Sequence, residues 1–329
     1  MTPILSCTDL RVWYPIRRGV FQRVTGHVHA VDGVSLRLAP GETLGLVGES
    51  GCGKTTLGRT LVGLEKPTAG QVFWEGKPLD ALPKAERRNV RRNLQMIFQD
   101  PFSSLDPRMS AMELVTEGLQ VHGLYLPGES RQEAAARLMK EVGLEPETMF
   151  RYPHEFSGGQ RQRLSIARAI SLEPKVVVCD EPVSALDVSV QAQVIRLLAQ
   201  LQKSRGLSYL FISHDLSVVR LLARRVAVMY LGRVVEEGLA QEVLQAPRHP
   251  YTQALVSAIP VPGKSSRDQR ILLKGELPSP SHPPVGCPFH PRCPYAQERC
   301  ARECPPLAPA GPQRTLACWR TPERISPEK

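Results

Sequence analysis

No apolar stretch in the sequence is long enough to cross a membrane. The longest apolar runs, at residues 176–179 and 226–231, are far shorter than the roughly 20 residues that a transmembrane helix needs. The first residues also lack the basic segment, apolar stretch and small-residue cleavage site of a signal peptide. Internal repeats and coiled-coil heptads are absent as well. We therefore expect a chain that stays in the cytoplasm and does not span the bilayer.

Cysteine and proline are scarce in most of the chain and concentrated near its end. Only three of the eight cysteines precede residue 280, and 17 of the 30 prolines lie in the last 87 residues. We therefore predict a compact domain over residues 1–242 and an extension over residues 243–329. In a cytoplasmic chain, the late cysteines indicate metal binding before disulfide bonds.

Positive charge is in excess. The 42 Lys and Arg residues outnumber the 32 Asp and Glu residues and give a net charge of +10. This balance favours phosphorylated ligands, nucleic acid or an acidic membrane surface as partners, and charge alone does not choose among them. The chain of 329 residues is 42% hydrophobic, which is enough to bury a core and excludes disorder throughout.

Apolar patterns typical of strands and of helices alternate along the chain. Strands are expected at residues 10–14, 30–38, 42–47, 71–74, 176–179 and 209–213, and helices at residues 110–122, 129–142, 158–170 and 188–203. The strand at 176–179 is apolar throughout, as is typical of a strand buried on both faces of a parallel sheet. The alternation predicts an α/β fold.

A glycine-rich loop stands between a predicted strand and a helix-like segment. It matches the pattern Gly-x-x-x-x-Gly-Lys-Ser/Thr and consists of Gly48, Glu49, Ser50, Gly51, Cys52, Gly53, Lys54 and Thr55, with Thr56 following. The backbone N–H groups of such a loop point at phosphates, and the helix presents its positive end to them. Lys54 is expected to reach the β- and γ-phosphates, and Thr55 to hold Mg²⁺ through its hydroxyl.

Three further features narrow the nucleotide-binding prediction. Asp180 and Glu181 end an apolar strand, where one carboxylate suits Mg²⁺ and the second can orient or deprotonate a water molecule. Residues 157–160, Ser-Gly-Gly-Gln, open a helix and predict another anion site, with hydroxyl and backbone donors converging. His214 directly follows the predicted strand at 209–213.

With these motifs in this order, the chain resembles the nucleotide-binding domains of ABC transporters. Residues 156–160 resemble the LSGGQ signature with Phe at the first position, and residues 99–101 and 184–187 resemble the glutamine loop and the D-loop. The resemblance implies an α/β fold of the P-loop NTPase type with a RecA-like parallel sheet core. It also implies an N-terminal antiparallel β subdomain, a helical signature subdomain at about 101–172 and a C-terminal Cys/Pro-rich extension.

The resemblance assigns a role to each matching residue. The implied nucleotide-binding residues are Tyr14, Gly48, Glu49, Ser50, Gly51, Cys52, Gly53, Lys54, Thr55, Thr56, Ser157, Gly158, Gly159, Gln160 and Asp187. Tyr14 is expected to stack on adenine, with Trp13 as the competing candidate. The implied catalytic residues are Lys54, Gln99, Glu181 as general base, and His214 on the γ-phosphate. The implied Mg²⁺ ligands are Thr55, Gln99 and Asp180.

In this family the signature of one subunit closes on the ATP held by another. Ser157 and Gly159 would therefore serve the partner's nucleotide, and two ATP molecules would be buried in a head-to-tail dimer. Both half-sites carried by this chain match the family pattern, so the resemblance implies an active ATPase.

Other segments narrow the resemblance to the ATP-binding subunits of bacterial oligopeptide and dipeptide permeases. Residues 41–48, 98–108 and 249–252 carry this likeness, and an extra loop at 15–27 resembles the F-type, the second of two paired ATPases. The implied partners are a second homologous ATP-binding subunit in a heterodimer, two transmembrane permease subunits and an extracytoplasmic substrate-binding protein. The chain would be peripheral, at the cytoplasmic face of the inner membrane. Relatives with nearly the same ATPase carry nickel, glutathione or sugars, so the cargo stays open.

The late cysteines suit a metal centre. Cys287, Cys293, Cys300 and Cys318 are separated by five, six and 17 residues, with Cys304 between the last two. Paired Cys-x-x-Cys knuckles are absent, and four thiolates could hold Zn²⁺ or an iron–sulfur cluster, or stay unligated. Tails that resemble this one carry a [4Fe–4S] cluster on four cysteines. The resemblance therefore implies a cluster on Cys287, Cys293, Cys300 and Cys318 here. Cys304 departs from that pattern.

The alternative from another class is a soluble ABC ATPase that acts on nucleic acid. Such proteins usually have two cassettes in one chain or a long coiled coil between the motifs, whereas this chain has one cassette and a short insert. The basic side chains of Arg87, Arg88, Arg91 and Arg92 are expected to form a solvated face or to touch acidic lipid. We therefore expect no nucleic-acid partner.

Overall fold

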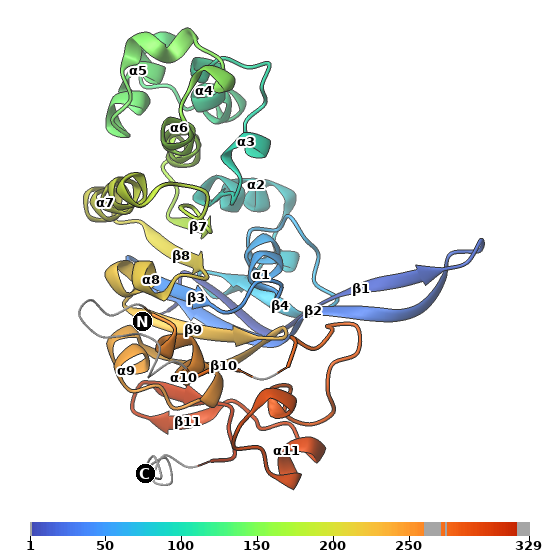
Figure 1. Ribbon diagram of the computed structural model, residues 1–329. Helices are drawn as coiled ribbons and strands as arrows, with labels where there is room; N and C mark the ends of the chain where they lie inside the picture. Colours follow the sequence, from blue (N-terminus) through green and yellow to red (C-terminus); the bar gives the residue numbers. More distant parts are fainter. Residues whose placement is uncertain (1, 260–270, 274, 321–329) are drawn as a thin grey trace. The chain divides into compact units, whose positions relative to one another are not determined.

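The computed structural model describes residues 2–259, 271–273 and 275–320, in two compact units (Figure 1). The first unit comprises residues 1–5, 38–42 and 74–212, and the second comprises residues 6–37, 43–73 and 213–329. Each unit is assembled from segments far apart in the sequence, and the domain boundary at residue 242 stays a prediction. Over the described ranges, no helix has both the length and the apolar character needed to cross a membrane.

The first unit contains three parallel strands in the order β8, β7, β6. They are β8 (Ser208–Ser213), β7 (Val176–Asp180) and β6 (Leu94–Ile97), joined to helices α2 (Lys84–Asn93) and α7 (Val188–Arg205). Val176 is the register partner of both Ser208 and Leu94. Every residue of β7 and β8 is buried, which explains why the sequence of these strands is almost continuously apolar.

Helices and one two-residue strand form the rest of the first unit. The longer ones are α4 (Ala111–His122), α5 (Arg131–Glu141) and α6 (Gly158–Ile170), and the shorter elements are β5 (Lys77–Pro78), η1 (Leu79–Ala81), α3 (Pro101–Ser104), η2 (Pro146–Phe150) and η3 (Pro153–Glu155). Each of the three longer helices begins at a serine that forms a capping box with the Glu or Gln three residues later. The predicted helices at 110–122, 129–142, 158–170 and 188–203 are confirmed, with ends shifted by at most two residues.

The second unit contains five strands of one sheet in the order β11, β12, β10, β9, β3. They are β3 (Thr43–Val47), β9 (Arg225–Tyr230), β10 (Arg233–Leu239), β11 (Ala308–Gly311) and β12 (Arg314–Leu316). Strand β3 is parallel to β9, and the remaining pairs are antiparallel. The helical elements are α1 (Lys54–Leu61), α8 (Leu216–Leu222), α9 (Ala240–Gln245), α10 (Pro250–Ser257), η4 (His290–Arg292) and α11 (Glu298–Arg302).

A long β-hairpin replaces the loop predicted at residues 15–27. Strand β1 (Leu5–Arg18) and strand β2 (Arg23–Leu38) run through that segment and leave only a short turn, and β4 (Ala69–Trp74) lies on the other side of β1 (Figure 1). The hydroxyl of Thr25 donates to the carbonyl oxygen of Ile16 at 3.2 Å, inside the predicted loop. The loop prediction was therefore wrong, because strand pairing continues past the short apolar pattern visible in the sequence.

A buried ion pair joins the C-terminal extension to the sheet. Glu236 of β10 and Arg314 of β12 have side chains that are 0% and 4% exposed, and Arg314 Nε donates to Glu236 at 3.0 Å. The same carboxylate accepts the backbone N–H groups of Arg248 and His249, each at 3.0 Å. Because each carboxylate oxygen has donors, this buried charge is fully compensated.

Replacing Glu236 with glutamine is expected to lower the free energy of unfolding by about 3–5 kcal/mol, since Arg314 would keep a buried charge without its counter-ion. Urea unfolding followed by circular dichroism measures the change. Glu298→Gln is the matched control, because the Glu298–Arg302 pair is 90% and 78% exposed and its loss should leave the unfolding curve unchanged. Equal curves for the two variants would contradict the importance of the buried pair.

Candidate functional site

The glycine-rich loop lies in the second unit, between β3 and α1. Gly53 has a φ of 101°, and a Cβ atom at this position would lie 1.9 Å from the carbonyl oxygen of Ala30. Gly51 has a φ of 79°, but a Cβ atom there would meet nothing within 4 Å. Only glycine fits at position 53, where the loop passes into the helix.

Lys54 is the first residue of α1 and is 4% exposed. Its ammonium group donates to the carbonyl oxygens of Gly48 at 2.9 Å and Glu49 at 3.0 Å, so the cation lies inside the curve of the loop. No side chain caps α1, and the N–H groups of its first turn have no partner within the helix. A buried cation and helix N-terminal donors therefore converge, as an anion site requires.

The two acidic residues lie in the first unit at the carboxyl end of β7, and Gln99 lies just beyond the end of the neighbouring parallel strand β6. Asp180 is the last residue of β7 and is 1% exposed, and Glu181 follows it with a φ of 44°. The Gln99 amide nitrogen, two residues after β6, donates to Glu181 Oε2 at 3.1 Å. The structure thus brings together Gln99 and Glu181, which the sequence places 82 residues apart.

The signature segment and the D-loop meet in the first unit. Ser157 caps α6 and accepts the N–H of Gln160, whose side chain accepts the N–H of Ser157 at 2.9 Å. A Cβ atom on Gly159 would lie 2.5 Å from Val190 in α7, and one on Gly158 would lie 3.7 Å from Leu186 of the D-loop. The two glycines let the start of α6 approach the segment that leads into α7.

The other predicted residues lie in the second unit. Tyr14 is in the middle of β1 and is 38% exposed, whereas Trp13 stacks on His29 with ring centroids 4.4 Å apart. That stack favours Tyr14 over Trp13 as the ring available to adenine, and the assignment stays a prediction. His214 lies between β8 and α8, in the same unit as the glycine-rich loop.

Four of the five late cysteines line one cavity in the second unit. They are Cys287, Cys293, Cys300 and Cys318. In the part of the chain that the structure describes, no three His, Cys, Asp or Glu residues form a group that could hold a single metal ion. Burial raises the pKa of Cys287 to about 12 and also raises the pKa of Cys293 and Cys318. These thiols are therefore protonated at neutral pH unless a metal binds them.

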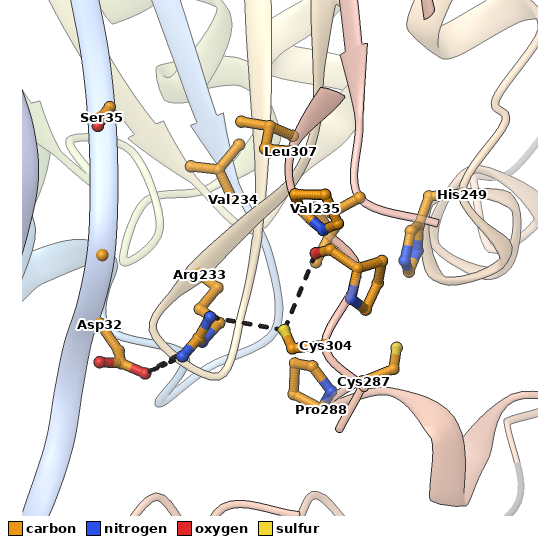
Figure 2. Close-up of a pocket in the computed structure, with 14 residues that line it drawn as sticks. Asp32, Ser35, Arg233, Val234, Val235, His249, Cys287, Pro288, Cys304 and Leu307 are labelled. Carbon is orange, nitrogen blue, oxygen red and sulfur yellow. Dashed lines mark hydrogen bonds and ion pairs between the residues drawn. The ribbon is translucent and has the colours of Figure 1, made fainter. Parts of the chain in front are cut away.

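Cys304 lines a second cavity, which has a volume of about 240 Å³ (Figure 2). Its sulfur accepts from Arg233 Nη1 at 3.5 Å, and Arg233 Nε donates to Asp32 at 3.0 Å. Cys287 lines both cavities, whereas Cys304 is absent from the lining of the four-cysteine cavity. This placement favours the ligand set without Cys304.

Sequence reasoning missed two residues that contact the glycine-rich loop. The Tyr251 hydroxyl accepts the backbone N–H of Glu49 at 2.8 Å, and Arg292 forms an ion pair with the Glu49 carboxylate at 2.8 Å. These partners are separated from Glu49 by 202 and 243 residues, so no local pattern could have revealed either contact.

Replacing Gly53 with alanine is expected to abolish ATP binding, because the new Cβ would meet the Ala30 carbonyl oxygen at 1.9 Å. Gly51→Ala is the matched control, with open space around the new methyl group, and its affinity should fall less than roughly tenfold. Titration of the purified chain with a fluorescent ATP analogue measures both. An equal loss of affinity in the two variants would contradict the conclusion that position 53 needs glycine because the backbone there passes close to the Ala30 carbonyl oxygen.

Comparison with known proteins identifies the family. Residues 31–184 match the family model described as ABC transporter, and residues 235–300 match the one described as oligopeptide/dipeptide transporter, C-terminal region. The oligopeptide transport ATP-binding protein AppF of Bacillus subtilis is 53% identical over 96% of this chain and 96% of AppF. The oligopeptide transport ATP-binding protein OppF of Salmonella typhimurium is 53% identical over 92% of each chain.

Solved structures agree with the sequence comparisons. The dimeric post-hydrolysis state of the ATP-binding cassette MJ0796, bound to ADP and Pi, superposes with a TM-score of 0.63 at 28% identity, over 72% of this chain and 98% of that one. The cbiO1 protein of Clostridium perfringens, part of an ABC transporter complex, gives a TM-score of 0.62 at 28% identity, over 75% and 92%. The predicted fold class is confirmed. The chain belongs to the ATP-binding subunits of ABC transporters, and it carries the C-terminal region of the oligopeptide/dipeptide branch.

Proposed function

We propose that this chain is the ATP-hydrolysing subunit of an importer for dipeptides and oligopeptides. The observation that carries the proposal is the extent of the similarity to AppF, an oligopeptide transport ATP-binding protein, which runs through 96% of the chain and so includes the extension as well as the cassette. The chain acts as a peripheral subunit at the cytoplasmic face of the membrane and supplies the importer with free energy from ATP.

The glycine-rich loop binds the triphosphate. Its backbone N–H groups and the Lys54 ammonium contact the β- and γ-phosphates, and the low exposure of Lys54 strengthens that attraction. Tyr14 stacks on adenine. Thr55, Gln99 and Asp180 would hold Mg²⁺ through the oxygen ligands that it prefers, and a bound ion would neutralise charge on the phosphates.

Glu181 is the general base for hydrolysis. Its carboxylate accepts the proton of the attacking water, and the hydrogen bond from Gln99 at 3.1 Å orients that carboxylate. His214 contacts the γ-phosphate. We propose that the Gln99 amide also contacts the membrane subunits, as the resemblance implies, so that its hydrogen bond to Glu181 links hydrolysis to the state of the transporter.

The chain works as half of an ATPase pair. Ser157 and Gly159 serve the nucleotide of a second, homologous ATP-binding subunit, and ATP binding closes the two subunits head to tail. The similar cassette bound to ADP and Pi is a dimer, which supports this arrangement. Two transmembrane permease subunits and an extracytoplasmic substrate-binding protein complete the importer.

Replacing Glu181 with glutamine in the assembled importer is expected to leave ATP affinity within about twofold and to slow hydrolysis at least roughly tenfold, as expected for loss of a general base. Peptide uptake into proteoliposomes should fall in parallel. Glu173→Gln is the matched control, because Glu173 lies in the same unit and also has a positive φ, 52° against 44° for Glu181. Near-normal turnover in Glu181→Gln would contradict its role as base.

The same proteoliposomes test the cargo. Uptake of labelled dipeptides and oligopeptides supports the proposal. Uptake of nickel, glutathione or sugar alone would contradict the peptide substrate but would leave the ATPase function of the chain standing. ATPase activity stimulated by DNA or RNA, together with purification free of any integral membrane protein, would contradict a transport function.

We also propose a [4Fe–4S] cluster on Cys287, Cys293, Cys300 and Cys318. One zinc ion would need its sulfur ligands about 2.3 Å from a single centre, whereas a cluster presents four separate irons to four thiolates that stand further apart. The observation that supports a shared centre is that the four cysteines line one cavity. The cavity is about 20 Å³, room for about one water molecule, so the cysteine-rich segment would have to open around the eight core atoms of a cluster. A bound cluster would be redox-active and would crosslink the four cysteines that hold it.

The chain purified without oxygen is expected to contain about four irons and four sulfides, with visible absorption, as a Cys-ligated cluster requires. Cys293→Ser should lose them, because it removes one thiolate. Cys304→Ser is the matched control and should keep them, since Cys304 lines the other cavity. Stoichiometric zinc, or no metal at all, would contradict the cluster and leave the ATPase proposal standing.

A further inference from the structure

Glu49, the second residue of the glycine-rich loop, is held through its side chain by the C-terminal extension. Arg292 Nη1 donates to Glu49 Oε2 at 2.8 Å, and Arg292 Nη2 donates to Glu49 Oε1 at 3.2 Å. The two side chains are 9% and 27% exposed. A two-point guanidinium–carboxylate pair of this low exposure fixes orientation as well as charge.

Arg292 is presented by a short turn with fixed geometry. It ends η4, where the N–H of His290 donates to the carbonyl oxygen of Cys287 at 3.0 Å and the N–H of Arg292 donates to that of Phe289 at 3.0 Å. The turn lies between Cys287 and Cys293, which both line the four-cysteine cavity. The position of the guanidinium therefore depends on how the cysteine-rich segment folds.

An aromatic cluster anchors the same segment beside the loop. Phe289 is 1% exposed and packs against Tyr230 and Tyr251, with ring centroids 5.2 Å and 5.5 Å apart. The Tyr251 hydroxyl accepts the N–H of Glu49 at 2.8 Å. Glu49 is thus held at its backbone by one residue of the extension and at its side chain by another.

The held residue contacts the lysine of the anion site. The carbonyl oxygen of Glu49 accepts the Lys54 ammonium at 3.0 Å, so a contiguous set of contacts runs from Arg292 through Glu49 to Lys54. The Glu49 carboxylate also carries a negative charge in a loop that binds an anion, and like charges repel more strongly where exposure is low. Arg292 compensates that charge.

We propose that Arg292 and Tyr251 are positioning residues for the nucleotide site: the extension sets ATP affinity by orienting Glu49 and compensating its charge. The inference rests on the proposed ATP-binding function of the loop. Neither residue touches the reacting atoms, so both act through Glu49.

A double-mutant cycle tests the inference in the full chain, with the dissociation constant for MgATP measured by isothermal titration calorimetry. Arg292→Gln is expected to weaken binding about five- to tenfold. In a Glu49→Gln background the same change should alter affinity less than about twofold, because the partner through which Arg292 acts is gone. Arg299→Gln is the matched control: Arg299 lies in the same extension, pairs with Glu303 at 2.9 Å and covers Trp319, and its loss should leave affinity unchanged.

Tyr251→Phe provides a second test that keeps the aromatic packing. Loss of the hydroxyl leaves the Glu49 N–H without its acceptor, so affinity should fall about threefold and hydrogen exchange at residues 48–54 should become faster. Arg292→Lys, which keeps the charge but not the two-point geometry, should bind ATP with intermediate affinity. Unchanged affinity in both Arg292→Gln and Tyr251→Phe, or an equal effect of Arg292→Gln in the two backgrounds, would overturn the inference. Failure of the parent chain to bind ATP would instead overturn the proposed function.

Discussion

Parallel strands buried on both faces determine where the functional residues lie. Strands β3, β6 and β7 consist largely of buried apolar residues, and each ends where a polar segment begins: the glycine-rich loop after β3, Gln99 after β6 and Asp180 at the end of β7. Because a one-residue slip would move every side chain to the opposite face and disrupt its close packing, these polar segments have fixed starting points. The buried apolar side chains of these strands take no part in the chemistry, but they determine where the functional residues lie.

Local patterns predicted the elements and the motifs well. The strand at β7 and the helices α4 to α7 follow from apolar periodicity. This signal extends over only a few residues, so a single sequence is enough to detect it. The glycine-rich loop could also be predicted from the sequence, because its residue types alone allow the backbone to turn at Gly53.

Contacts between distant segments could not be predicted. The hairpin at residues 15–27 continues past the apolar alternation because backbone pairing needs no particular side chain. The pair Glu236–Arg314 and the pair Glu49–Arg292 join residues 78 and 243 positions apart, and each arginine is one of many in a basic chain. Nor did cysteine spacing show that Cys304 is absent from the cavity that the other four late cysteines line, because that depends on the fold of a proline-rich segment.

The ion pair between Glu49 and Arg292 has a consequence for synthesis on the ribosome. Its two residues are 243 positions apart, so at a translation rate of about 5–20 residues per second the arginine is made roughly 12–50 s after the glutamate. By the end of that interval the nascent chain contains the whole glycine-rich loop, strand β3 before it and strand β9, which pairs with β3. A translation product that stops before residue 292 therefore carries an intact phosphate-binding sequence without the guanidinium that holds its second residue.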